Sequence, residues 1–347
     1  MMRERFWAYG DLRAVCLFRV CAGPLVIAHL WPFLRDAISG HYYRDGFYVP
    51  WFTHYPELPL PLYGALLGFG CVASVALSCG VAARAAACVC FGVVAYNFFL
   101  SETFFHHNRA FLLTFLFGLS CNACGDSLTL RPQPAPPPRR LWPLWLWRSL
   151  ACVPYLASSI SKLLDPDWFG GVVTWDRVER YRHAAERYVP VALVDLAARE
   201  SLHVWLAKVV IALELAIGLG LWFSRTRVLA VWLAVVFHLL IQASANIQVF
   251  SLLGIAGLAI WTTPRTRDRR LELRLDDPSA ARLARWTQRL DWLARFELHF
   301  VASGPAIALH DRDGQRLEGR RAVWHVLARL PATAFVGLPA IGFGLSW

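Results

Sequence analysis

The chain has 347 residues, of which 57% are hydrophobic and 17% charged, and its formal net charge is +11. A soluble domain carries about 25% charged residues, so this composition excludes an ordinary globular enzyme and is typical of a polytopic membrane protein. The positive charge does not indicate a nucleic-acid partner, because the arginines flank apolar runs, where they direct membrane topology toward an anionic leaflet.

Apolar stretches predict about eight transmembrane helices, since one helical span needs roughly 20 mostly apolar residues. The expected spans are residues 15–34, 62–80, 82–101, 109–124, 141–164, 202–223, 227–242 and 247–262. The fold class is therefore an all-α polytopic membrane protein over residues 1–262, followed by a small α+β tail over residues 263–347. The lipid bilayer is the first partner that this pattern implies.

Arginine placement predicts how the chain crosses the membrane. Arginines precede the first span, follow the second, connect the fourth to the fifth and the sixth to the seventh, and follow the eighth. The positive-inside rule places these segments, and so both termini and the tail, in the cytoplasm of an inner or cell membrane. The extracytoplasmic side then receives residues 35–61, 102–108, 165–201 and 243–246, and we expect short interfacial helices within 165–201.

Lys162 lies near the end of the fifth stretch and is one of only two lysines in the chain. A desolvated lysine, unlike arginine, can lose its proton and act as a base. An ionisable residue at membrane depth indicates a functional site, and the extracytoplasmic interface is where we expect this one. The alternative is that Lys162 extends its ammonium group to the interface and only anchors the helix.

Other polar residues also interrupt the apolar stretches. Each charge at the bilayer centre costs at least about 3 kcal/mol, so several of them require a shared polar interior. His107 and His238 are expected at a depth similar to that of Lys162, which predicts a catalytic pocket, although separate core histidines are the alternative. Arg19 and Glu214 could form an internal ion pair, or Glu214 could hold a lysine or histidine in its working protonation state.

Cysteines are numerous but give little indication of chemistry. Nearly all nine lie inside apolar runs, where a free cysteine behaves as a small hydrophobic residue. Cys121 and Cys124 form one Cys-x-x-Cys pair with no second pair nearby, which supports a metal site only weakly. We therefore expect packing roles and no metal, and a redox partner using Cys121 and Cys124 is a weaker alternative.

The tail, residues 263–347, is polar and rich in arginine. Its pattern predicts an amphipathic helix over 279–295, a strand over 296–301, a hairpin over 307–319 with an Asp-Gly turn, and a helix over 321–330 that Pro331 stops. The apolar run 333–347 is too short for a ninth span, and we expect it to dock or to lie at the interface.

Four stretches carry a resemblance to a known family. They are Leu12-Arg-Ala-Val-Cys-Leu-Phe-Arg19-Val with the later His41-Tyr-Tyr-Arg-Asp-Gly, His106-His107-Asn108 before Gly125-Asp-Ser-Leu, Tyr155 through Trp168, and Phe237-His238 through Phe250. In order and spacing they resemble the vitamin K-dependent gamma-carboxylase family and its bacterial relatives, the HTTM (horizontally transferred transmembrane) domain proteins.

The resemblance implies a carboxylase-like lyase that performs quinone- and oxygen-linked modification, with glutamate gamma-carboxylation and hydroquinone epoxidation as one form. The implied cofactor is a lipophilic quinone, reduced vitamin K or menaquinol, with O2 and CO2 as co-substrates and no metal. Lys162 would deprotonate the hydroquinone, and His107 and His238 would line the site. The pocket would also include Glu214, Asn108, Asp167, Trp168 and Arg19.

Two departures limit what the resemblance implies. The chain has no room for the large lumenal region with which the carboxylase binds its protein substrate, so the substrate is an unknown peptide or small molecule. A non-catalytic membrane scaffold or a lipid- or quinone-binding protein is the alternative function. The tail resembles the thioredoxin-like DCC domain, but residues 276–282, where that domain carries Cys-x-x-Cys, contain no cysteine, which implies a structural tail.

Overall fold

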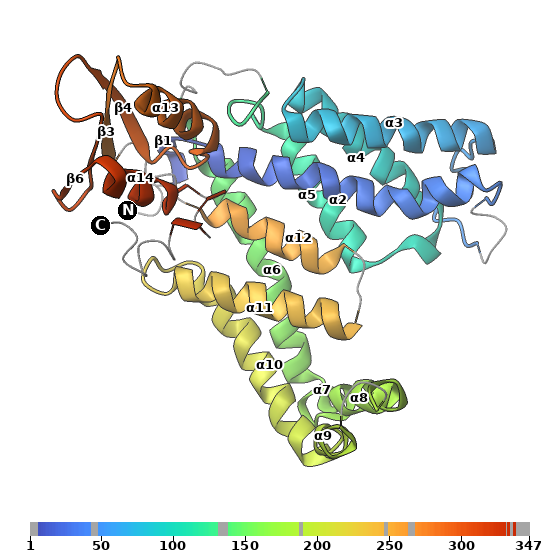
Figure 1. The fold of residues 1–347 in the computed structure, drawn as a ribbon. Helices are drawn as coiled ribbons and strands as arrows, with labels where there is room; N and C mark the ends of the chain where they lie inside the picture. The colour runs from blue at the N-terminus through green and yellow to red at the C-terminus, as the bar shows by residue number, and fades with distance from the viewer. Residues whose placement is uncertain are drawn as a thin grey trace. The chain divides into compact units, whose positions relative to one another are not determined.

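The computed structural model describes residues 6–42, 48–130, 138–186, 190–245, 249–262, 268–330, 332–333 and 336–337. The described residues are mostly helical. Contacts divide the chain into two compact units (Figure 1): unit 1 comprises residues 1–144 and 262–347, and unit 2 comprises residues 145–261. The domain boundary expected near residue 262 stays a prediction.

Consecutive helices pack against one another in unit 1. They are α2 (Arg13–Ile38), α3 (Leu60–Cys79), α4 (Ala83–Leu100), the 3-10 helix η2 (Glu102–Phe104) and α5 (His107–Cys121). Glycine permits a close approach: a Cβ at Gly70 of α3 would lie 2.8 Å from Val93 Cγ1 of α4. Small residues at helix contacts are typical of membrane bundles, in which packing drives helix association.

Unit 2 contains most of α6 and all the helices up to residue 261. They are α6 (Trp142–Leu164), α7 (Pro166–Phe169), α8 (Val172–Ala185), α9 (Val191–Ala197), α10 (Glu200–Gly220), α11 (Arg227–Ala245), α12 (Phe250–Gly257) and the 3-10 helix η3 (Leu258–Trp261). Helices α7, α8 and α9 are the short helices expected within residues 165–201. Their interfacial position remains a prediction.

Each of the eight expected spans contains a helix, but not each helix qualifies as a span. Among the described residues, four helices are long and apolar enough to cross a membrane: α2, α3, α4 and α10. Helix α5, with 15 residues, is about 22 Å long, and α12 has only 8 residues, whereas the hydrocarbon core is about 30 Å thick. These features indicate an integral membrane protein, and the number of eight spans is not confirmed.

The tail forms a four-stranded sheet in the order β4-β3-β5-β6. Its elements are β3 (Arg269–Arg274), α13 (Pro278–Leu290), β4 (Phe296–Val301), β5 (Ile307–His310), β6 (Arg316–Glu318) and α14 (Gly319–Leu327). Strand β3 pairs in parallel with β4 and antiparallel with β5. The predicted strand and hairpin are therefore confirmed, and Gly314 adopts the positive φ of +83° that its turn requires.

Three features of the tail differ from the prediction. The central strand β3 was missed, because its leucines alternate with charged residues in a segment that reads as polar. The helix expected over 279–295 ends at Leu290. It ends there because the Asp291 carboxylate accepts the backbone N–H groups of Arg295 and Phe296, each at 2.9 Å, and so turns the chain into β4. The last helix, expected over 321–330, likewise ends early, at Leu327 of α14, and Pro331, its expected stop, lies outside the described residues.

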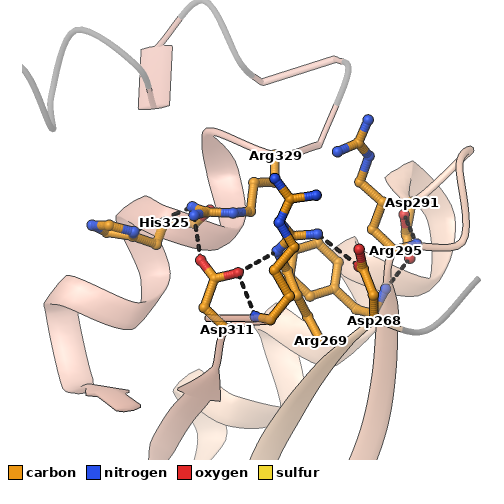
Figure 2. Close-up of polar contacts among 9 residues, drawn as sticks. Asp268, Arg269, Asp291, Arg295, Asp311, His325 and Arg329 are labelled. Atoms are coloured by element: carbon orange, nitrogen blue, oxygen red, sulfur yellow. Dashed lines mark hydrogen bonds and ion pairs between the residues drawn. The ribbon is translucent and has the colours of Figure 1, made fainter. Parts of the chain in front are cut away.

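Asp311 connects three elements of the tail (Figure 2). Its side chain is 5% exposed and pairs with Arg269 of β3, whose Nε lies 2.8 Å away, and with Arg329, which follows α14. Burial by itself would raise the pKa of the Asp311 carboxyl, but the backbone N–H of Arg312 and the two guanidinium groups outweigh burial and lower this pKa. The ionised carboxylate therefore stabilises the tail above a pH of about 4, and this stabilisation is lost as the pH falls through the lowered pKa.

We predict that Asp311→Asn loosens the sheet. Removing one partner of a buried pair leaves guanidinium groups without compensation, which costs about 3 kcal/mol. Amide hydrogen exchange of the full-length protein in detergent should become faster in β3 and β5. Glu318→Gln is the matched control, because the pair of Glu318 with Arg316 is exposed. Equal exchange rates in the two variants would contradict this role of Asp311.

Candidate functional site

Lys162 and Glu214 form an ion pair between α6 and α10. Lys162 Nζ donates to Glu214 Oε1 at 2.6 Å and to Ser158 Oγ at 2.8 Å, and Ser158 Oγ donates to the same carboxylate oxygen at 3.1 Å. The exposed fractions of the side chains are 15% for Lys162 and 4% for Glu214. Ser158 lies one helical turn before Lys162 and therefore shares its face. This spacing could have indicated Ser158, which the sequence analysis missed.

A close approach of the two helices supports this pair. A Cβ at Gly218, one turn after Glu214, would lie 2.6 Å from Leu156 Cδ2 of α6. Any residue larger than glycine at position 218 would therefore require the Leu156 side chain to move. Position 218 thus keeps the carboxylate of α10 within reach of the ammonium group of α6.

Only one oxygen of the Glu214 carboxylate has a partner among the described residues. Oε2 is buried and accepts no hydrogen bond there. An unsatisfied buried acceptor costs free energy, so Oε2 is a position where a hydroxyl or N–H group of a ligand or water would be stabilised. Among the same residues, no group of three His, Cys, Asp or Glu side chains could hold a metal ion.

The turn after α6 places an aromatic ring on Lys162. Asp165 caps α7, since its Oδ1 accepts the backbone N–H groups of Asp167 at 2.9 Å and Trp168 at 3.3 Å. The Trp168 ring centroid lies 4.8 Å from Lys162 Nζ, within cation–π distance. The side chain of Asp167, also predicted for the site, is exposed. The other lysine, Lys208, lies 5.0 Å from the ring centroid of Phe169, the next residue of α7.

His238 of α11 is 2% exposed and has a single described polar partner, the hydroxyl of Tyr155 on α6, 2.6 Å from Nε2. Its Nδ1 is buried without a partner among the described residues. Tyr155 precedes Lys162 by seven residues, so the two lie on one face of α6, roughly 10 Å apart along its axis. His238 thus contacts the face of α6 that also carries Lys162. A pocket shared by His238 and Lys162 stays a prediction.

The remaining predicted site residues belong to unit 1. His107 begins α5 with an exposed side chain, and its ring lies 5.2 Å from that of Phe105. Asn108 is buried, and its backbone N–H donates to His106 Nδ1 at 3.3 Å. A pocket that joins His107 to Lys162 stays a prediction.

Arg19 is fully buried and donates to main-chain carbonyls. Its acceptors are the oxygens of Leu77 at 3.1 Å, Ser127 at 3.3 Å and Leu128 at 2.5 Å. These bonds join α2 to the end of α3 and to the segment after α5. The ion pair considered for Arg19 and Glu214 was wrong, because the partner of Glu214 is Lys162 and the partners of Arg19 are backbone oxygens.

Two further features bear on the predicted chemistry. All nine cysteines lie in described residues and none forms a disulfide; Cys121 is exposed and Cys124 is buried. A cavity of about 150 Å³ is lined by Phe33, Asp36, His41, Tyr42, Tyr63 and Phe104. None of the predicted catalytic residues lines this cavity.

We predict that Gly254→Ala displaces His238. A Cβ at position 254 of α12 would overlap the imidazole of His238, which is 2% exposed. The variant should therefore unfold in detergent at a temperature several degrees lower, since overpacking costs roughly 1–3 kcal/mol. Gly257→Ala is the control in the same helix, because nothing lies within 4 Å of its added Cβ. Equal melting temperatures for the two variants would show that His238 is not held in this way.

Comparison with known proteins supports the family indicated by the sequence motifs. A sequence model of the HTTM domain matches residues 9–265, which include both the Lys162–Glu214 pair and His238. No curated protein and no solved structure matches the chain significantly. Because the matched region covers well over half of its length, the chain belongs to the HTTM domain family.

Proposed function

We propose that this protein is an integral membrane enzyme in which Lys162 and Glu214 act together as the acid–base group of a carboxylase-like, quinone- and oxygen-linked modification. The observation that carries the proposal is the buried ammonium–carboxylate pair whose second carboxylate oxygen has no described partner. The family resemblance supplies the class of reaction. The modified substrate is an unknown peptide or small molecule, with glutamate gamma-carboxylation as one form of the reaction.

The ion pair has the properties that proton transfer near a membrane requires. Its two charges cancel, and a proton can pass between Lys162 and Glu214 along the existing 2.6 Å hydrogen bond. When the proton lies on the carboxylate, Lys162 is a neutral amine and can act as a base. When a substrate hydroxyl instead transfers its proton to Glu214, the Lys162 ammonium group stabilises the anion that remains.

The residues around the pair fit a reduced quinone such as reduced vitamin K or menaquinol. Glu214 Oε2 would accept a ring hydroxyl, and Trp168 presents an aromatic ring next to the ammonium group. The exposed side chains of Ile160, Leu163 and Leu164 on α6 make this part of the helix accessible to an apolar molecule. A bound hydroquinone would supply the reducing equivalents for O2, and CO2 would be the second co-substrate. His238 and His107 are proposed to position reactants.

The membrane orientation is part of the same proposal. The apolar stretches predict eight spans. Given these spans, the distribution of arginine predicts cytoplasmic termini and a site near the extracytoplasmic interface. Lys162 in the last turn of α6 and the short helices α7 to α9 after it support this orientation. An extracytoplasmic pocket would receive a lipid-soluble quinone from the bilayer and a polar substrate from the aqueous side.

A structural role for the pair is the alternative, and one observation favours it. Lys162 has a carboxylate, a hydroxyl and an aromatic ring as partners, so its charge is well compensated. In that case the protein would be a membrane scaffold or a lipid- or quinone-binding protein. The two functions differ in whether the chain turns over a hydroquinone.

We expect the purified protein, given reduced vitamin K or menaquinol with O2 and bicarbonate, to produce the quinone epoxide, which chromatography detects. Lys162→Ala should reduce the rate at least about 100-fold, the usual contribution of an acid–base group. Glu214→Gln should cause a comparable loss, because Lys162 then has no acceptor for its proton.

Lys208→Ala is the matched control, because Lys208 also lies beside an aromatic residue of α7 but has no described carboxylate partner. This variant should retain the rate of the unaltered protein. Epoxide formation that survives in Lys162→Ala would refute the assigned base. The complete lack of epoxide from the folded, unaltered protein would favour the scaffold or binding function.

A further inference from the structure

Arg148 is a buried cation near the end of α6 opposite to Lys162, roughly 21 Å away along the helix axis. Arg148 is 4% exposed, and its Nε donates to the carbonyl of Ile260 at 3.1 Å. The guanidinium carbon lies 5.0 Å from the ring centroid of Trp145 and 5.2 Å from that of Trp261. Arg148 is thus held between two indole rings within unit 2.

A second cation shares one of these rings. The guanidinium carbon of Arg227, the first residue of α11, lies 5.5 Å from the ring centroid of Trp261. Its Nε donates to the carbonyl of Leu221 at 2.9 Å, and its Nη2 donates to that of Trp222 at 3.4 Å. Two like charges therefore lie near one indole, and each is fixed in place by a main-chain carbonyl.

No carboxylate compensates these charges in this part of the chain. The segments 145–164 and 215–261, which contribute both arginines and their described contacts, contain no Asp or Glu. The acidic residues that border these segments are Asp165, which caps α7, and Glu214, which is paired with Lys162. Cation–π contacts offset only part of the cost of a desolvated guanidinium group, and the two like charges repel each other.

A third donor near these cations is also unsatisfied. Trp261 is 2% exposed, and its indole N–H is buried without an acceptor among the described residues. Buried indole N–H groups usually have a partner. A ligand that carries negative charge and several acceptor oxygens would be stabilised by these two guanidinium groups and the N–H group next to them.

We propose that Arg148, Arg227 and the Trp261 indole N–H form a binding site for a phosphate group. A guanidinium fork matches the geometry of phosphate oxygens, and the anion would compensate both charges and satisfy the third donor. This site is independent of the proposed catalysis at Lys162.

The surroundings of the site favour a phospholipid headgroup as the source of the phosphate. Residues next to Arg227 expose large apolar side chains, namely Phe223, Val228, Leu229 and Trp232. Such side chains would contact acyl chains while the arginines bind the headgroup. The arginine-rich side of the chain is also the side expected at the anionic cytoplasmic leaflet. A free phosphate has the same binding chemistry, and the experiment distinguishes the two sources.

The test uses the full chain in non-ionic detergent, with phosphatidylglycerol or phosphatidylcholine of identical acyl chains added to it. Native mass spectrometry counts bound lipid, and thermal unfolding reports the stabilisation. We expect phosphatidylglycerol to bind and to raise the melting temperature, with phosphatidylcholine much weaker. Arg227→Gln should weaken phosphatidylglycerol binding about tenfold, as expected for one lost charge-assisted contact.

Arg225→Gln is the matched control, because Arg225 is exposed and lies only two residues from Arg227; it should bind as the unaltered protein does. Arg227→Gln is preferred to Arg148→Gln, since Arg148 is buried and its loss could prevent folding. Millimolar inorganic phosphate could also raise the melting temperature of the unaltered protein. If Arg227→Gln abolishes this protection, the result would support the site with a soluble ligand. Equal binding of the two lipids without such protection, or equal binding by the two variants, would overturn the proposal.

Discussion

The cost of a charge away from water is the constraint on which this structure depends. Three cations held away from water are compensated in three different ways. Arg19 donates to three main-chain carbonyls, Lys162 pairs with Glu214, and Arg269 shares a carboxylate with a second arginine. These interactions join segments that are distant in the sequence, so the groups that are most expensive to bury also determine which helices and strands must lie together.

Only the pair at Lys162 combines such compensation with an acceptor that has no described partner. A carbonyl cannot take up a proton and an arginine does not release one, so the contacts of Arg19 hold the fold without offering acid–base chemistry. A lysine and a carboxylate can exchange a proton, and Glu214 has a second oxygen available. The choice of lysine at this position, in a chain whose only other lysine is Lys208, is chemically consistent with a reactive pair.

Close backbone approaches bring the polar groups of unit 2 together. Gly218 allows α10 to approach α6 next to Glu214, and Gly254 leaves space for His238 between α11 and α12. Because no Cβ separates the helices at these two positions, polar groups can approach to hydrogen-bond distance and rings can pack against one another. Packing in this unit therefore serves the polar contacts as well as the stability of the helices.

The sequence by itself determined the local features of the protein. Apolar runs predicted the helices, Asp-Gly predicted the hairpin turn of the tail, and the rarity of lysine directed attention to Lys162. Each of these features depends on residues that are close together in the sequence. The sequence motifs that include Lys162 and His238 were also enough to indicate the HTTM family. The sequence did not determine the length of each apolar helix: eight spans were expected, and among the described residues four helices satisfy length and composition.

Only the tertiary structure decided which distant groups meet. Glu214 lies 52 residues from Lys162, and Tyr155 lies 83 residues from His238, so no local pattern could assign these partners. Strand β3 became recognisable only through its pairing with β4 and β5 on either side. The physical reason is that helix rotation and strand pairing are set by packing over the whole unit, and this packing determines which polar side chains face one another.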